Sequence, residues 1–148
     1  MIYFSDFDAA GVLDKMVSTT VFPSSPFSPI SSTYVDVLNQ NGGSAVQVSI
    51  TKGAGTSLLV MASMSVSTGV TGNHTITLGV NDGTTDHDIA RIRAEGTATT
   101  LCRTAVGNVL ITGLSAGSYT LTLRVKDAVG TAGFGSNDSA SLSVMEVA

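Results

Sequence analysis

The sequence predicts an all-β protein, an antiparallel β-sandwich that follows an extended N-terminal arm. Apolar residues alternate with Ser, Thr and Gln along most of the chain after residue 33, which is the period of a half-buried strand. Gly-containing turns separate these segments at intervals of roughly 8–12 residues, as in sandwiches and barrels. A length of 148 residues suits one domain with a sizeable core. We therefore expect an arm over residues 1–32 and one sandwich domain over residues 33–148.

The predicted arm is unusually rich in proline and aromatic residues. It holds all three prolines and four of the five Phe residues of the chain. Because proline fixes φ and lacks a backbone donor, this stretch cannot be a central strand. A weak helix is expected only around Asp8 to Val17, where Gly11 lowers the helix propensity. The arm either packs on its own domain or grips a partner, and we favour a partner. The attachment residues would be Tyr3, Phe4, Phe7, Phe22 and Phe27.

The strands of the sandwich follow from strict alternation. One face of each predicted strand is apolar and the other carries mainly hydroxyl groups, as in antiparallel sheets with one solvated side. The apolar sets are Val46, Val48 and Ile50; Leu58, Val60, Ala62, Met64 and Val66; Ile76, Leu78 and Val80; and Tyr119, Leu121, Leu123 and Val125. Turn signals lie at residues 41–43, 53–55, 81–83, 116–117 and 133–135. Eight or nine strands between residues 33 and 147 predict a sandwich or jelly roll.

Charge is scarce throughout the chain. Charged residues make up 12% of the sequence, about half of the usual 25%, and 19 Ser and 19 Thr residues take their place. A net charge of −4 with seven dispersed Lys and Arg residues argues against a nucleic-acid partner. No apolar run is long enough for a membrane-spanning helix, and the N-terminus does not resemble a signal peptide. The single cysteine, Cys102, is expected to be a buried small residue of a protein that folds in a reducing cytoplasm.

No catalytic motif is present, so neither an enzyme nor a cofactor is expected. The sequence lacks a nucleophile elbow, and its two Gly-x-Gly fragments open no predicted helix. His74 is expected at the surface, on the Thr side of its strand. The charged residues Arg91, Arg93, Glu95 and Arg103 either pair across a subunit interface or are solvated, and we favour solvation.

Hard metal ligands gather only in residues 82–88. Asp82, Asp86 and Asp88 lie near His87, and calcium accepts several carboxylates at such spacing. Alternation, however, places Asp86 and Asp88 on the face opposite His87. A hairpin turn at residues 81–83, with the carboxylates keeping a sheet edge soluble, is therefore favoured over a metal site.

The C-terminal third of the chain resembles a known group of sandwiches. A glycine, the alternating strand from Tyr119 to Lys126, a Gly-rich turn and a last strand from Leu142 to Val147 are similar to the closing strands of trimeric jelly rolls. This fold is typified by the complement globular head and tumour necrosis factor families and also occurs in bacteriophage virion proteins. The resemblance implies a homotrimer, for which the outward-facing Leu59 and Met61 are interface candidates.

Together these features predict a non-enzymatic phage structural protein. The most concrete hypothesis is a trimeric capsid decoration or cementing protein at the virion surface. Its arm would bind the major capsid protein or another virion protein. The alternative is a tail-fibre tip or a receptor- or carbohydrate-binding module, which would use the loops at Asn81–Asp88 and Gly130–Asp138. A fold alone does not separate these functions.

Overall fold

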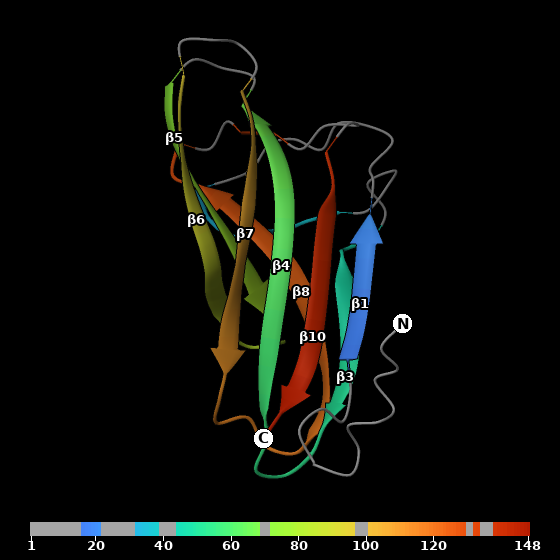
Figure 1. The fold of residues 1–148 in the computed structure, drawn as a ribbon. Coiled ribbons are helices and arrows are strands. Elements are labelled where there is room, and N and C mark those ends of the chain that lie inside the picture. The colour runs from blue at the N-terminus through green and yellow to red at the C-terminus, as the bar shows by residue number, and fades with distance from the viewer. Residues whose placement is uncertain are drawn as a thin grey trace.

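The computed structural model describes residues 16–21, 32–38, 44–68, 72–96, 101–129, 132–133 and 138–148, and these form two antiparallel sheets packed face to face (Figure 1). Sheet 1 has the strand order β1 (Met16–Val21), β10 (Ala140–Val147), β4 (Ser57–Thr68) and β7 (Leu101–Ile111), and β9 (Ala132–Gly133) also pairs with β4. Sheet 2 has the order β2 (Val35–Asp36), β8 (Gly117–Asp127), β5 (Gly72–Asn81) and β6 (Asp86–Gly96), with β3 (Gln47–Lys52) also paired with β8.

The connections make this sandwich a jelly roll. The chain passes from β3 in sheet 2 to β4 in sheet 1 and back to β5, and it crosses again after β6, β7 and β8. All the sheet pairings are antiparallel. The predicted all-β class and jelly-roll sandwich are confirmed. In the described part of the chain, β2 to β10 lie between residues 33 and 147, which agrees with the expected strand count.

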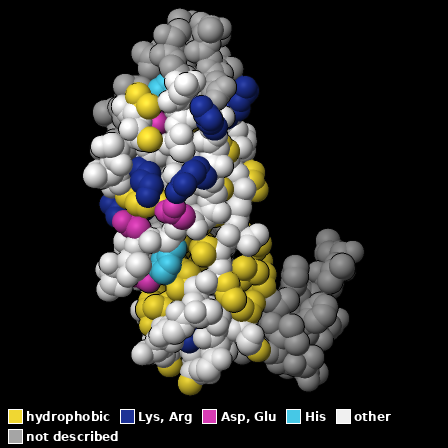
Figure 2. Space-filling model, turned by 90° about the vertical axis from the view of Figure 1, so that its left-hand side faces the viewer, with side chains coloured by type: hydrophobic (Ala, Val, Ile, Leu, Met, Phe, Trp, Pro, Cys, Tyr) yellow, Lys and Arg dark blue, Asp and Glu magenta, His cyan; other side chains and the backbone are white. Residues whose placement is uncertain are grey.

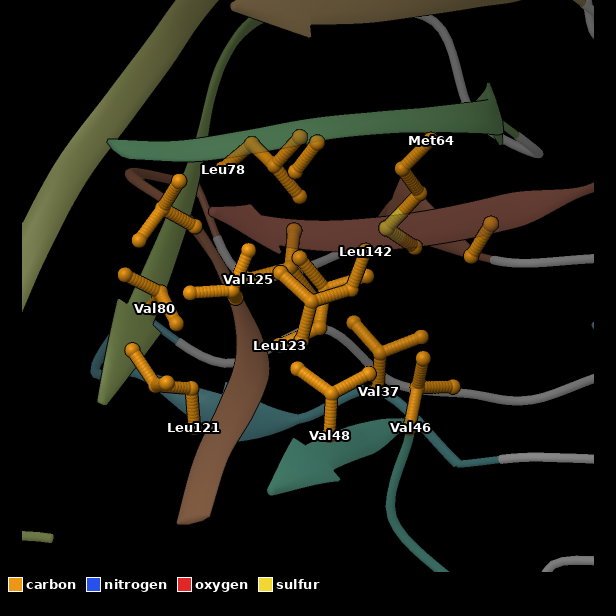
Figure 3. Packing of buried hydrophobic residues seen from close by; sticks show 14 of the residues in the cluster. Val37, Val46, Val48, Met64, Leu78, Val80, Leu121, Leu123, Val125 and Leu142 are labelled. Atoms are coloured by element: carbon orange, nitrogen blue, oxygen red, sulfur yellow. The ribbon is translucent and has the colours of Figure 1, made fainter. Parts of the chain in front are cut away.

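The core lies between the two sheets and is built by alternation. Along β8 the inward side chains of Leu121, Leu123 and Val125 are fully buried, and along β10 Leu142 and Val144 are fully buried as well. Figure 3 shows side chains from both sheets, with those of the segment around Val37 and Val46, meeting in this layer. Removing these aliphatic groups from water supplies most of the driving force for folding.

Sheet 1 includes a strand from the range assigned to the N-terminal arm. β1 pairs along β10, from Met16 opposite Met145 to Val21 opposite Ala140. Residues 16–21 are therefore extended, and they are hydrogen-bonded into the sandwich. The helix expected over residues 8–17 is wrong at Met16 and Val17, where cross-strand pairing determines the backbone conformation. The attachment residues Tyr3, Phe4, Phe7, Phe22 and Phe27 lie outside the described residues.

Candidate assembly surface

The outer face of sheet 1 carries no charged side chain at its described positions. Alternation turns every second residue of β1, β10, β4 and β7 away from the core. These outward residues are Met16, Ser18, Thr20, Ser57, Leu59, Met61, Ser63, Ser65, Thr104, Val106, Asn108, Leu110, Ser141, Ser143, Met145 and Val147. All of them are neutral, although the strands are long enough to present several charges.

A row of large apolar side chains crosses this face. Met16 lies opposite Met145, Met145 opposite Leu59, and Leu59 opposite Leu110. Met16 and Leu110, at the two ends, are each 52% exposed, and the two middle residues are half-buried. Neighbouring strands are about 4.8 Å apart, so the row forms one continuous apolar band, which we call the apolar row.

Val106 adds a further apolar side chain to the same face. It precedes Leu110 on β7, on the same side of the strand, and is 70% exposed. Figure 2 views the molecule edge-on to sheet 1, from the side where β5, β6 and β7 lie in Figure 1, and shows charged side chains gathered in one group and hydrophobic ones in another. Exposed apolar side chains that cluster, rather than scatter singly, are typical of interaction surfaces.

The hydroxyl groups around the apolar row bond to one another. Ser63 and Ser141 are joined across β4 and β10 at 2.7 Å, and Ser65 and Thr104 across β4 and β7 at 3.2 Å. Because these groups already have partners, covering them costs less than covering free polar groups. Subunit interfaces have cores depleted of charge and enriched in methionine. The face therefore has the chemistry of a surface that packs against protein.

The interface candidates Leu59 and Met61 lie on this outer face, as their alternation predicted. Whether they contact another subunit stays a prediction. Sequence reasoning did not find Met16, Met145 and Leu110, the other members of the apolar row. The apolar run Val109, Leu110 and Ile111 does indicate a strand with two apolar faces. Only the strand register, however, shows which outward residues of neighbouring strands lie side by side.

The outer face of sheet 2 is charged. Arg124 on β8 pairs with Asp36 on β2 and Asp86 on β6, at 2.9 and 3.0 Å. Arg91 and Lys126 both approach Asp88, at 3.1 and 3.5 Å. Arg91 thus pairs within its own chain, with its side chain 63% exposed. Exposed pairs of this kind add little stability. Their presence shows that the outer face of sheet 2 is suited to contact with water.

The hairpin predicted at residues 81–83 is confirmed, because β5 and β6 pair antiparallel up to Asn81 opposite Asp86. The carboxylates of residues 82–88 are divided among separate partners. The side chain of Asp82 accepts hydrogen bonds from the Thr84 and Thr85 amides, at 2.9 and 2.8 Å, and from His87 Nε2 at 2.9 Å. Asp86 and Asp88 lie on the opposite face from His87, bound to the cations of sheet 2. No group of three or more possible metal ligands occurs among the described residues.

Asp82 is expected to stabilise the hairpin most strongly as a carboxylate. Burial raises its pKa, but the hydrogen bonds from His87, Thr85 and Thr84 outweigh burial and hold the pKa well below the ordinary 3.8. A depressed pKa gives stabilisation that is complete above the ordinary value and declines as the pH falls below it. We predict that Asp82→Asn lowers the free energy of unfolding by about 1–2 kcal/mol at pH 7. The deficit should shrink between about pH 5 and pH 2.

Urea unfolding at pH 7, 4 and 3 measures this deficit. Asp36→Asn is the matched control, because Asp36 is an exposed carboxylate on the same sheet. Its loss should cost less than about 1 kcal/mol. An Asp82→Asn deficit that stays constant across this pH range would contradict the assigned role.

A buried polar pair lies inside the sandwich. His74 is 1% exposed and its Nδ1 lies 2.7 Å from Oδ2 of the fully buried Asp127. The expected surface position of His74 is therefore wrong, because His74 has the same strand parity as the inward Ile76 and Leu78. Its Nε2 has no hydrogen-bond partner in the described structure. Among the described residues, no hydroxyl or thiol is hydrogen-bonded to that nitrogen.

Breaking this pair on one side should cost more than removing both members. We predict that His74→Leu lowers the free energy of unfolding by about 1–3 kcal/mol, because Asp127 loses a partner inside the core. The double variant His74→Leu with Asp127→Asn should cost less than the sum of the two single changes. A double-mutant cycle by urea unfolding measures the difference. Strict additivity would show that the two side chains do not interact.

The comparisons with known proteins find similar folds. No family model and no curated protein sequence match the chain. A chain from the structure of infectious bursal disease virus, Gx strain, matches with a TM-score of 0.43 and 17% identity over 90% of this chain and 33% of that one. A chain from the Gt strain gives 0.39 and 16%, over 91% and 38%. This protein thus spans about a third of the length of those chains.

A third solved structure is similar over a larger share of its own length. It is a pentameric capsid protein isolated from metagenomic phage sequences, with a TM-score of 0.39 and 11% identity over 100% of this chain and 83% of that one. No helix in the described part of the chain could span a membrane.

Proposed function

We propose that the protein is a non-enzymatic structural subunit of a phage virion, most concretely a trimeric capsid decoration or cementing protein. The observation that carries the proposal is the charge-free outer face of sheet 1 with its apolar row. The sequence resemblance to virion jelly rolls supports a place in a virion. The outer face of sheet 2 is charged, which supports contact with other subunits through sheet 1 alone.

The chemistry of the face favours packing against copies of the same surface. An uncharged face leaves no buried ion unpaired when two or three copies meet, whatever their exact register, whereas a misplaced charge would cost several kcal/mol. Four strands about 4.8 Å apart and about eight residues long give a flat area of roughly 500 Å². Stable complexes bury about 800 Å² per partner. Self-association through this face should therefore be of micromolar strength, enough for a trimer in solution at micromolar concentration, and a further contact is needed to hold the trimer on a particle.

The N-terminal arm supplies that further contact in our proposal. Residues 1–15 join the sandwich at Met16, the first member of the apolar row and part of an edge strand. Fifteen extended residues reach about 50 Å, far enough to lie on a neighbouring subunit. Each buried Phe side chain would contribute roughly 1.5–3 kcal/mol before ordering costs. Tyr3, Phe4 and Phe7 lie in this segment, and Phe22 and Phe27 follow β1.

Particle binding tests the proposal. Deleting residues 1–15 leaves β1 in place, so the variant should fold and fail to bind purified particles. The wild-type chain should be found in many copies on the head by electron microscopy and mass spectrometry. Undiminished binding of the variant would exclude a role in attachment for residues 1–15, with Tyr3, Phe4 and Phe7. A few copies at the tail would favour the alternative, a tail-fibre tip or receptor- or carbohydrate-binding module.

A further inference from the structure

A trough runs along β5 on the outer face of sheet 2. Its floor is made of small residues, and the longer side chains of Arg91 on β6 and Lys126 on β8 lie on either side of Thr77. At Gly79 the trough is filled by Tyr34, because a Cβ on that glycine would lie 2.6 Å from the tyrosine Oη. Over Thr75 and Thr77 the trough stays open. This hollow has a volume of about 240 Å³ and is lined by Ser32, Thr75, Thr77, Arg91, Lys126 and Ala128.

The carboxylates around the trough are divided unevenly among its cations. Arg124 has two carboxylate partners, Asp36 and Asp86. Asp88, by contrast, is shared by two cations, Arg91 and Lys126. These three cations and three carboxylates are neutral as a whole, but Arg91 and Lys126 share one carboxylate beside the hollow, and no carboxylate is among the residues that line it. An anionic group placed there would meet cations whose other hydrogen-bond donors remain available.

Tyr34 and Asp88 hold this arrangement in place. The Tyr34 hydroxyl donates a 2.5 Å hydrogen bond to Asp88 Oδ1, and Lys126 Nζ lies 4.0 Å from the centre of the tyrosine ring. The hydrogen bond from Tyr34 lowers the pKa of Asp88, which keeps this carboxylate ionised. An ionised Asp88 anchors Arg91 and Lys126 at the walls of the trough. The hollow is thus built by β5, β6 and β8 together with Tyr34, which precedes β2.

The lining of the hollow favours an acidic sugar. Its volume of about 240 Å³ is below the 300–1,000 Å³ typical of drug-sized ligands and suits a single small group. Hydroxyls of Ser32, Thr75 and Thr77 match the hydroxyls of a sugar ring, and a guanidinium matches a carboxylate. We propose that this hollow binds a carboxylate-bearing sugar residue, with the carboxylate against Arg91 and Lys126. It lies on the sheet opposite the assembly surface and does not depend on the proposed function.

Glucuronate titration of the ¹⁵N-labelled full chain at constant ionic strength tests the proposal. Saturable amide shifts should centre on Thr75, Thr77, Arg91 and Lys126, with a millimolar dissociation constant. Glucose lacks the carboxylate and acetate lacks the ring, so each should bind at least about tenfold more weakly. Arg91→Gln should weaken glucuronate binding by about tenfold.

Arg103→Gln is the matched control, because it removes the same charge from an exposed residue that does not line the hollow. It should leave glucuronate binding unchanged. The absence of saturable shifts at tens of millimolar would overturn the proposal. So would equal binding of acetate and glucuronate, which would indicate an acidic side chain as the natural occupant, or equal binding by Arg91→Gln and wild type. None of these results bears on particle binding, so the two proposals fail separately.

Discussion

Replacing Leu123 with alanine is expected to lower the free energy of unfolding by about 2–5 kcal/mol. Leu123 is fully buried in the middle of β8 and lies among the side chains shared by the two sheets (Figure 3). The substitution removes three carbon atoms from a close-packed layer and leaves a cavity that rigid neighbouring strands cannot close. Domains of this size are stable by only about 5–15 kcal/mol, so the variant should lose a large fraction of its stability.

The same substitution at Leu110 is the control. Leu110 lies on the outer face of sheet 1 and is 52% exposed, so alanine there should cost less than about 1 kcal/mol. Urea unfolding should be measured at protein concentrations low enough that the midpoint no longer depends on concentration, since self-association adds apparent stability. Equal losses for the two variants would show that Leu123 is not at the centre of the core.

Placing a charge in the apolar row is expected to reduce self-association by about 100-fold or more. Leu59 lies between Met145 and Leu110 in the row, so Leu59→Lys would bury an ammonium group wherever copies meet. An unpaired charge in an interface costs about 3 kcal/mol or more, which corresponds to that loss of affinity. Because the side chain points away from the core, the folded sandwich should keep its stability to within about 1 kcal/mol.

Gln47→Lys is the matched control for this experiment. Gln47 is an exposed residue of β3, on the sheet with the charged outer face, and it receives the same added charge. Sedimentation velocity should show wild-type association for Gln47→Lys and a shift to single chains for Leu59→Lys. If both variants associate as the wild type does, sheet 1 is not the assembly surface.

The strands were predictable because alternation is local. From Tyr119 to Lys126 and from Leu58 to Val66 the apolar period fixes both the strand and its buried face. β1 was not recognised, because Met16–Val21 has only two large aliphatic positions on its inner side and precedes a Pro-rich stretch. Its conformation comes from pairing with β10, more than a hundred residues later in the chain, and no local pattern carries that information.

The candidate sites were less predictable because they depend on register. Leu59 and Met61 could be placed on the outer face from parity alone, but the apolar row also needs Met16 and Leu110, brought together by three strand pairings. The trough likewise depends on Tyr34, which contacts Asp88 although 54 residues separate them. His74 differs from these cases, since its parity with Ile76 was visible in the sequence and indicated an inward side chain, whereas we expected His74 at the surface.

The mass of the isolated chain in solution tests the central claim most directly. The claim is that the neutral outer face of sheet 1 is an assembly surface between copies of this protein. Light scattering at micromolar concentration should give a particle of three times the 15.0 kDa of the chain, and Leu59→Lys should abolish it. A wild-type particle of 15.0 kDa at that concentration would contradict the claim.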